Sequence, residues 1–336
     1  MFSLINRNLK IKGTRFNGLS AFSLVSFLVI ALIINEHADG KYPDQVREVQ
    51  IKSSMDGTFQ KSLFFAPESG KKVPLLVALH TWSSGWQNTY NVPLAEGCIE
   101  RQWAFIHPDF RGPNKGPDAC GSDLAVSDII DAVKWAKEKT GIDTSRIYLA
   151  GASGGGHMAL QMAGRAPHIW AGVSSWVPIT DCAAWHAECQ RSGRRYYKDL
   201  EASCKGKPGD SAEVDLEYRK RSPLTWLGKA SNVPLDINAG IRDGHEGSVP
   251  ISHSLKAFNL LADSSLKLTE EQIDYFTKES KVPESLKGAG PDPSYGKDRQ
   301  PLWRAQSKAA RITIFDGGHE MIPSAIFDWL TGQKKP

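Results

Sequence analysis

The sequence predicts an α/β domain built on a doubly wound, mostly parallel β-sheet. From residue 46 onward, short apolar runs alternate with segments whose apolar residues recur at helical spacing. The run at 73–79 is continuously apolar, as is typical of a parallel strand buried on both faces. A length of 336 residues is sufficient for one large domain of this class. We place this domain at residues 45–331.

Strands and helices are expected to alternate along the domain. The two opening strands, at 47–51 and 62–65, should form an antiparallel hairpin. Ser122 is the expected N-cap of a helix at 123–138, whose apolar residues have helical spacing. The other expected strands lie at 73–79, 104–107, 146–150, 170–177, 234–239 and 311–315, and the other helices at 157–162, 249–262 and 321–331.

Two segments interrupt this alternation. Residues 180–232 are rich in Cys, Arg, Lys, Tyr and Trp and show little apolar periodicity, which predicts a cap inserted after a strand. Residues 263–309 are polar, with many prolines and glycines near 283–301, and are expected to form a surface insertion. The sheet itself is therefore expected to form outside these two segments.

Residues 1–38 have the features of an export signal. Four basic residues and no acid precede an apolar stretch at 21–34. That stretch is shorter than the ~20 residues of a membrane span and suits a secretory signal peptide. Because residues 35–38 lack an A-x-A cleavage pattern, an uncleaved N-terminal anchor is the alternative. We expect an extracytoplasmic protein, secreted or periplasmic, with membrane association through residues 1–38 only.

Charge and cysteine content bear on nucleic-acid binding, disulfides and metal binding. Beyond residue 38 the chain carries 37 basic and 36 acidic residues without a charge run, so no nucleic-acid partner is expected. Five cysteines in an exported chain suggest disulfides. We expect a Cys98–Cys120 bridge and a second bridge among Cys182, Cys189 and Cys204. The absence of C-x-x-C argues against zinc, and no cofactor is expected.

A G-x-S-x-G motif at 151–155 lies between an expected strand and an expected helix. This context is that of a nucleophile elbow, where a serine occupies a sharp and strained turn. Glycine neighbours allow the strand and the helix to pass close to each other. The amide of Gly154 lies at a helix N-terminus, where negative charge is stabilised. Ser153 is therefore the candidate nucleophile.

A serine hydroxyl needs a general base, and the base needs an orienting carboxylate. His319 follows the last expected strand, and Asp243 follows the strand at 234–239, so both lie at carboxyl ends of strands. Asp316 is the rival carboxylate, but it belongs to an Asp-Gly-Gly sequence that is typical of a turn. We favour Asp243.

A developing oxyanion needs two backbone donors. The amide of Gly154 is the first, and the loop after the strand at 73–79 should supply the second. Within that loop we favour the amide of Trp82, with Thr81 as the alternative. Three tryptophans in the expected site loops and cap are candidates for stacking on a substrate, although ordinary packing explains them equally well: Trp86, Trp176 and Trp185.

These residues resemble the α/β-hydrolase superfamily, in particular its prolyl-oligopeptidase-like and polyester-depolymerase-like group. The matching residues are 76–80, 141–143 with Arg146, 151–156, 221–224, Asp243 with 249–250, and 317–319. The resemblance implies the α/β-hydrolase fold with a cap and a triad of Ser153, Asp243 and His319. It also implies that Asp143, with Arg146, braces the strand that enters the elbow.

Two departures accompany this resemblance. Thr81 stands where the group usually has glycine, and the link between Asp243 and His319 is longer than usual. The triad predicts a serine hydrolase but leaves the bond open. We favour a carboxylic ester of a small molecule or polymer, such as an acylated polysaccharide or a polyester, because esters need less leaving-group assistance. The alternatives are an exported serine peptidase and a non-catalytic binding protein on this scaffold.

Overall fold

The computed structural model describes residues 40–336. The chain divides into residues 1–41 and a second unit, Tyr42–Pro336, which contains the sheet. The expected export signal at 1–38 lies outside the described residues and stays a prediction. Within residues 40–336, no helix has the length and apolar character needed to cross a membrane.

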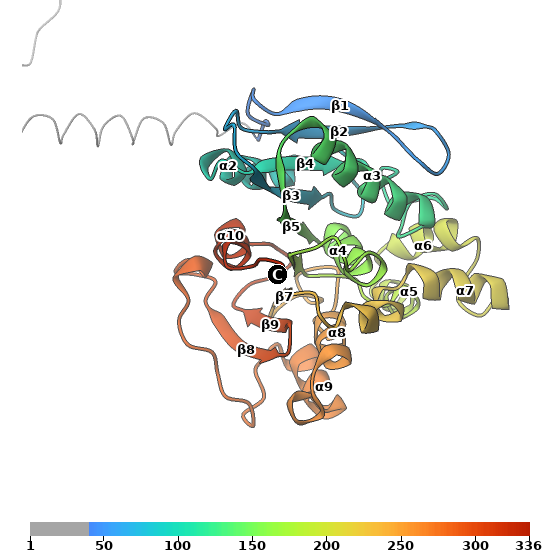
Figure 1. Ribbon diagram of the computed structural model, residues 1–336. Helices are drawn as coiled ribbons and strands as arrows, with labels where there is room; N and C mark the ends of the chain where they lie inside the picture. The colour runs from blue at the N-terminus through green and yellow to red at the C-terminus, as the bar shows by residue number, and fades with distance from the viewer. Residues whose placement is uncertain (1–39) are drawn as a thin grey trace, which may run out of the picture. The chain divides into compact units, whose positions relative to one another are not determined.

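Nine strands of the described chain form one sheet in the order β1-β2-β4-β3-β5-β6-β7-β9-β8 (Figure 1). The six central strands, from β4 to β9 in this order, are parallel, and β1, β2 and β8 are antiparallel to their neighbours. This confirms the expected mostly parallel sheet. The bounds are β1 Arg47–Lys52, β2 Phe59–Phe65, β3 Val73–Leu79, β4 Ala104–Pro108, β5 Ile142–Ala152, β6 Gly172–Trp176, β7 Leu235–Gly240, β8 Pro301–Ser307 and β9 Ala310–Phe315.

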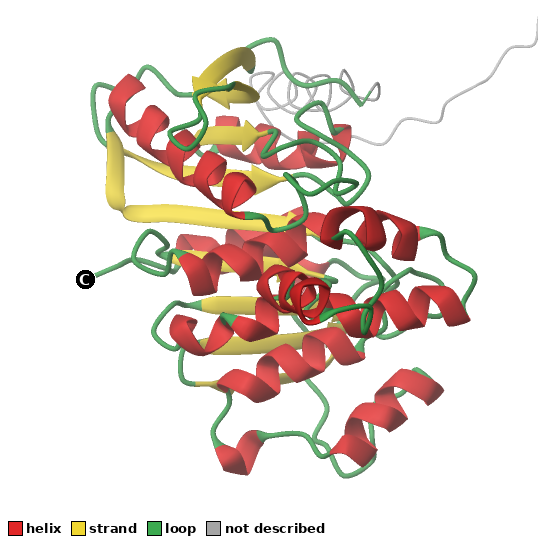
Figure 2. Cartoon of the chain, turned by 90° about the vertical axis from the view of Figure 1, so that its right-hand side faces the viewer, coloured by secondary structure: helices red, strands yellow, loops and turns green. Residues whose placement is uncertain are grey.

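Helices cover both faces of the sheet, which explains why every residue of β3 is buried. Helices α2 and α10 contact each other on one face, and α3, α4 and α8 pack on the other (Figure 1). In Figure 2 the helices of this second face lie in front of the strands. Ser122 caps α3 as expected, since its hydroxyl accepts a hydrogen bond from the Ala125 amide. The bounds are α2 Val92–Glu100, α3 Asp123–Lys139, α4 Gly154–Arg165, α8 Ser252–Leu261 and α10 Pro323–Thr331.

The segment expected to form a cap contains three helices that contact one another, α5 Cys182–Arg191, α6 Tyr196–Cys204 and α7 Ala212–Arg221. Their apolar side chains form a hydrophobic cluster separate from the main core. Trp82, from the loop after β3, belongs to this cap cluster. The loop is therefore packed against the cap.

The segment 263–309 is more than a surface insertion. It contains α9 Glu270–Glu279 and the edge strand β8, which pairs with β9. Trp303 of β8 is buried and packs against Phe258 of α8 and Phe276 of α9. The strand escaped prediction because only alternate residues face the core, which is typical of an edge strand with a polar outer face.

The expected disulfides are wrong. All five cysteines lie within the described residues, and each is a buried free thiol. Cys98 faces the main core from α2, whereas Cys120 belongs to the cap cluster, so the two cannot pair. No bridge joins Cys182, Cys189 and Cys204 either. Cys98 packs in the main core as a small apolar residue, and burial raises the pKa of its thiol.

Asp143 and Arg146 form an ion pair at the start of β5, with 2.7 Å between Arg146 Nε and Asp143 Oδ2. Hydrogen bonds from Ser145 and this pairing lower the pKa of Asp143 to about 2. Its stabilising effect is thus fully present above the pKa of an unfolded aspartate, ~3.9, and is lost as the pH falls toward the folded value.

We expect Asp143→Asn to lower the free energy of unfolding by about 0.5–1 kcal/mol near neutral pH, since the pair is partly exposed. This difference from the parent protein should shrink below a pH of about 4. Urea unfolding of both proteins at a series of pH values measures it. A difference that stays constant down to a pH of about 3 would contradict the assigned pairing.

Candidate active site

Ser153 lies at the sharp turn between β5 and α4. Its backbone angles are φ 57° and ψ −118°, a strained conformation for a residue other than glycine. The glycines on either side are required by close packing. A Cβ on Gly151 would lie 2.6 Å from the Gly155 carbonyl, and a Cβ on Gly155 would lie 2.4 Å from the Leu79 oxygen. The elbow therefore has the geometry that the motif predicts.

The imidazole of His319 is paired with Asp243. Nδ1 of His319 lies 2.9 Å from Oδ2 and 3.0 Å from Oδ1 of Asp243, whose side chain is 1% exposed. Oδ1 also accepts a hydrogen bond from the Gly244 amide at 2.9 Å. A carboxylate at Nδ1 holds the proton on that nitrogen and leaves Nε2 free to accept another. The pairing with Asp243 thus fixes the orientation of the His319 ring.

Asp316, the rival carboxylate, has a different partner. It is exposed and accepts a hydrogen bond from Arg242. No hydrogen bond joins it to His319 within residues 40–336. Of the two carboxylates considered from the sequence, the structure brings Asp243 to the histidine.

Ser153 and His319 line the same cavity, which has a volume of about 230 Å³. The two residues come from the ends of β5 and β9, so the parallel sheet brings them to one edge. Tyr90, Val177 and Tyr196 add apolar and aromatic surface to the wall. The cavity therefore combines a nucleophilic hydroxyl, an oriented imidazole and room for part of a substrate.

The backbone at Gly154 touches the backbone of Trp82. A Cβ on Gly154 would lie 2.4 Å from the Trp82 nitrogen and 3.0 Å from the Thr81 carbonyl carbon. The Gly154 amide begins α4, and the first amides of a helix have no partner within it. In the described part of the chain, no hydrogen bond occupies the Trp82 amide. This contact favours Trp82 over Thr81 as the second oxyanion donor.

The comparisons agree with this geometry. Residues 122–279 match the model of the prolyl oligopeptidase family, peptidase S9. The chain has the α/β-hydrolase fold and resembles the prolyl oligopeptidase family. No curated protein sequence matches this chain.

Solved peptidases share the fold of this chain. An acylaminoacyl peptidase from Pyrococcus horikoshii aligns with a TM-score of 0.52 and 18% identity over 69% of this chain and 36% of its own. A puromycin-hydrolyzing peptidase from Mycobacterium tuberculosis aligns with a TM-score of 0.52 and 19% identity over 65% of this chain and 33% of its own. The chain thus spans about one third of the length of these peptidases.

The expected stacking tryptophans do not face the cavity. Trp176 is 0% exposed and packs on Phe315, and Trp185 is 1% exposed and packs on Trp82 and Tyr196. Neither ring can stack on a substrate, so these two predictions are wrong. Trp86 is half-buried beneath the Lys61 ammonium and is not part of the cavity wall. The tryptophans serve packing, which the sequence alone could not distinguish from binding.

Asp199 of α6 is a site residue that the sequence did not indicate. Its Oδ2 accepts a hydrogen bond of 3.2 Å from the indole nitrogen of Trp82. Burial raises the pKa of Asp199. The Trp82 ring is also held edge-on against Trp185, with 4.7 Å between centroids. The cap thereby fixes the residue whose amide is the candidate oxyanion donor.

Proposed function

We propose that this chain is a serine hydrolase whose nucleophile is Ser153. The observation that carries the proposal is the pairing of Asp243 with His319 at 2.9 Å, beside a cavity that His319 shares with Ser153. Ser153 Oγ forms a bond to the substrate carbonyl carbon while its proton passes to Nε2 of His319. The same proton then goes to the leaving group, and water hydrolyses the acyl-enzyme by the reverse route.

Negative charge develops on the carbonyl oxygen during both steps. In this proposal the amides of Gly154 and Trp82 stabilise it, and the positive end of the α4 dipole contributes. Asp243 stabilises the imidazolium that forms on His319.

We infer that the bond cleaved is a peptide bond. The family match supports this choice, because the matching family is one of peptidases, and both structural neighbours described above are named peptidases. The triad chemistry is the same for esters, which the sequence analysis favoured. Export of the enzyme rests on residues 1–38 alone and stays a prediction.

Turnover of internally quenched peptides and of p-nitrophenyl esters by the parent protein and by Ser153→Ala tests the proposal. We expect cleavage of at least one peptide, and its loss in Ser153→Ala. If the protein hydrolyses the esters but none of the peptides, the proposed activity changes from peptidase to ester hydrolase. No serine-dependent turnover of either substrate would favour a binding protein.

A further inference from the structure

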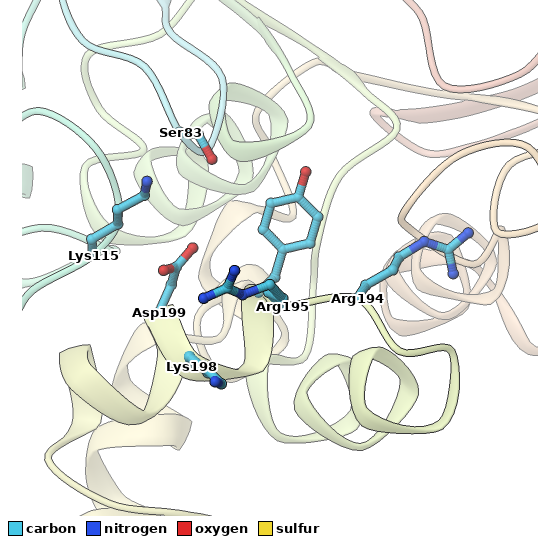
Figure 3. Close-up of a pocket in the computed structure, with 7 residues that line it drawn as sticks. Ser83, Lys115, Arg194, Arg195, Lys198 and Asp199 are labelled. Atoms are coloured by element: carbon cyan, nitrogen blue, oxygen red, sulfur yellow. The ribbon is translucent and has the colours of Figure 1, made fainter.

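A second cavity of about 500 Å³ lies beside the site cavity (Figure 3). The two cavities share Ser83 and Tyr196 in their walls, so they are adjacent. Ser83 follows Trp82, the candidate oxyanion donor, and Tyr196 begins α6 of the cap. A substrate held at Ser153 can therefore extend past these two residues into the second cavity.

The wall of the second cavity is strongly basic. Four cationic residues and one acidic residue line it: Lys115, Arg194, Arg195, Lys198 and Asp199. We call this second cavity the basic pocket. Lys115 comes from the loop before α3, whereas the others lie just before α6 or in its first turn, so two distant segments bring these charges together. Clustered like charges repel each other and create a positive potential that attracts anions.

The cations of the basic pocket are not neutralised by ion pairs. Within residues 40–336, none of the four lies within 4.0 Å of a carboxylate oxygen. Figure 3 shows the Arg195 guanidinium turned toward Asp199, and the positive charges of Lys115 and Arg195 both act on that carboxylate. Asp199 in turn is engaged by the Trp82 indole. One carboxylate thus faces an excess of positive charge.

One cation also connects the basic pocket to the catalytic pair. The Arg194 guanidinium donates a hydrogen bond to the carbonyl of Gly247. Gly247 packs so closely on the pair that a Cβ there would lie 2.2 Å from Asp243 Oδ1 and 2.4 Å from His319 Cβ. Arg194 extends away from Lys115 and Arg195 in Figure 3, which leaves those two for a ligand.

We propose that the basic pocket binds the carboxylate of an acidic side chain in a peptide substrate, close to the scissile bond. This proposal rests on the proposed function. Guanidinium and ammonium groups form charge-assisted hydrogen bonds with carboxylates, which are stronger than those between neutral groups. The exposed side chains of Lys115, Arg195 and Lys198 can reach such a carboxylate without leaving water. The substrate class is therefore an acidic peptide.

Matched peptide pairs test the proposal. Each pair differs only by Glu or Gln at one position, and the position moves along the residues that flank the scissile bond. We expect kcat/KM to be about tenfold or more higher for Glu than for Gln at one of these positions. Raising NaCl from about 50 to about 500 mM should reduce this ratio, because salt screens exposed charges.

Charge-reversal variants assign the preference to the pocket. Lys115→Glu and Arg195→Glu should each reduce the Glu-to-Gln ratio toward one and favour a Lys-containing peptide. Lys297→Glu makes the same charge change at an exposed position outside both cavities and should keep the ratio of the parent protein. Labelling of Ser153 by a fluorophosphonate checks that each variant is folded.

The outcomes separate this proposal from the proposed function. Equal cleavage of the Glu and Gln peptides at every position would contradict carboxylate binding by the basic pocket, but it would not contradict the proposed peptidase activity. A Glu preference that survives both pocket variants would also overturn it. The absence of any serine-dependent peptide cleavage would overturn both proposals together.

Discussion

Asp243→Asn is expected to reduce kcat by about 10⁴-fold, the typical effect of this change in a catalytic triad. An amide at this position can donate a hydrogen bond to Nδ1 of His319, where the carboxylate now accepts one. The imidazole proton would then move to Nε2, so His319 could not take the proton of Ser153. Steady-state kinetics on a peptide or on a p-nitrophenyl ester measures the loss.

Asp316→Asn is the matched control for this experiment. It makes the same change three residues before His319, at a carboxylate that is exposed and bonded to Arg242. We expect this variant to keep most of the activity, because Asp316 is bonded to Arg242 and not to His319. Equal losses in the two variants would show that Asp243 is not the acid of the site.

Gly154→Ala is expected to reduce kcat by about 10²–10³-fold, the effect of losing one oxyanion donor. The added methyl group would lie 2.4 Å from the Trp82 nitrogen, and backbone atoms cannot rotate away as a flexible side chain can. The loop after β3 must therefore move, which separates the two amides. The kcat of the purified variant, together with its melting temperature, measures this effect.

Gly228→Ala controls for the general cost of adding a methyl group, because no atom lies within 4 Å of that position. It should keep the kcat of the parent protein. If Gly154→Ala is folded and equally active, the amides of Gly154 and Trp82 do not act together, and the oxyanion site must lie elsewhere.

The local signals in the sequence predicted most of the sheet and the strand-end positions of the three proposed triad residues. The run at β3 was clear because a strand buried on both faces is apolar throughout. Ser153, Asp243 and His319 were proposed because each follows a strand of the expected parallel sheet, and the structure places the three strands in one sheet. Their order along the chain, Ser, Asp and then His, is the order typical of α/β-hydrolases, which this sequence resembles.

The features that the sequence did not predict depend on tertiary packing. Trp176 and Trp185 lie near the site in the chain, but only the fold shows that neighbouring side chains bury them. Edge strand β8 alternates polar and buried residues within a segment rich in prolines and glycines, so it resembles a loop. The basic pocket joins Lys115 to residues 194–199, and no local pattern connects two such distant segments.

Fluorophosphonate labelling followed by peptide mass spectrometry is the most direct test of Ser153 as nucleophile. The reagent forms a bond between phosphorus and the nucleophile oxygen and releases fluoride, so it reports activation of the hydroxyl independently of the natural substrate. We expect one adduct, on Ser153, and much slower labelling in His319→Ala. An adduct on another residue, or no adduct on the folded protein, would contradict the assignment of Ser153.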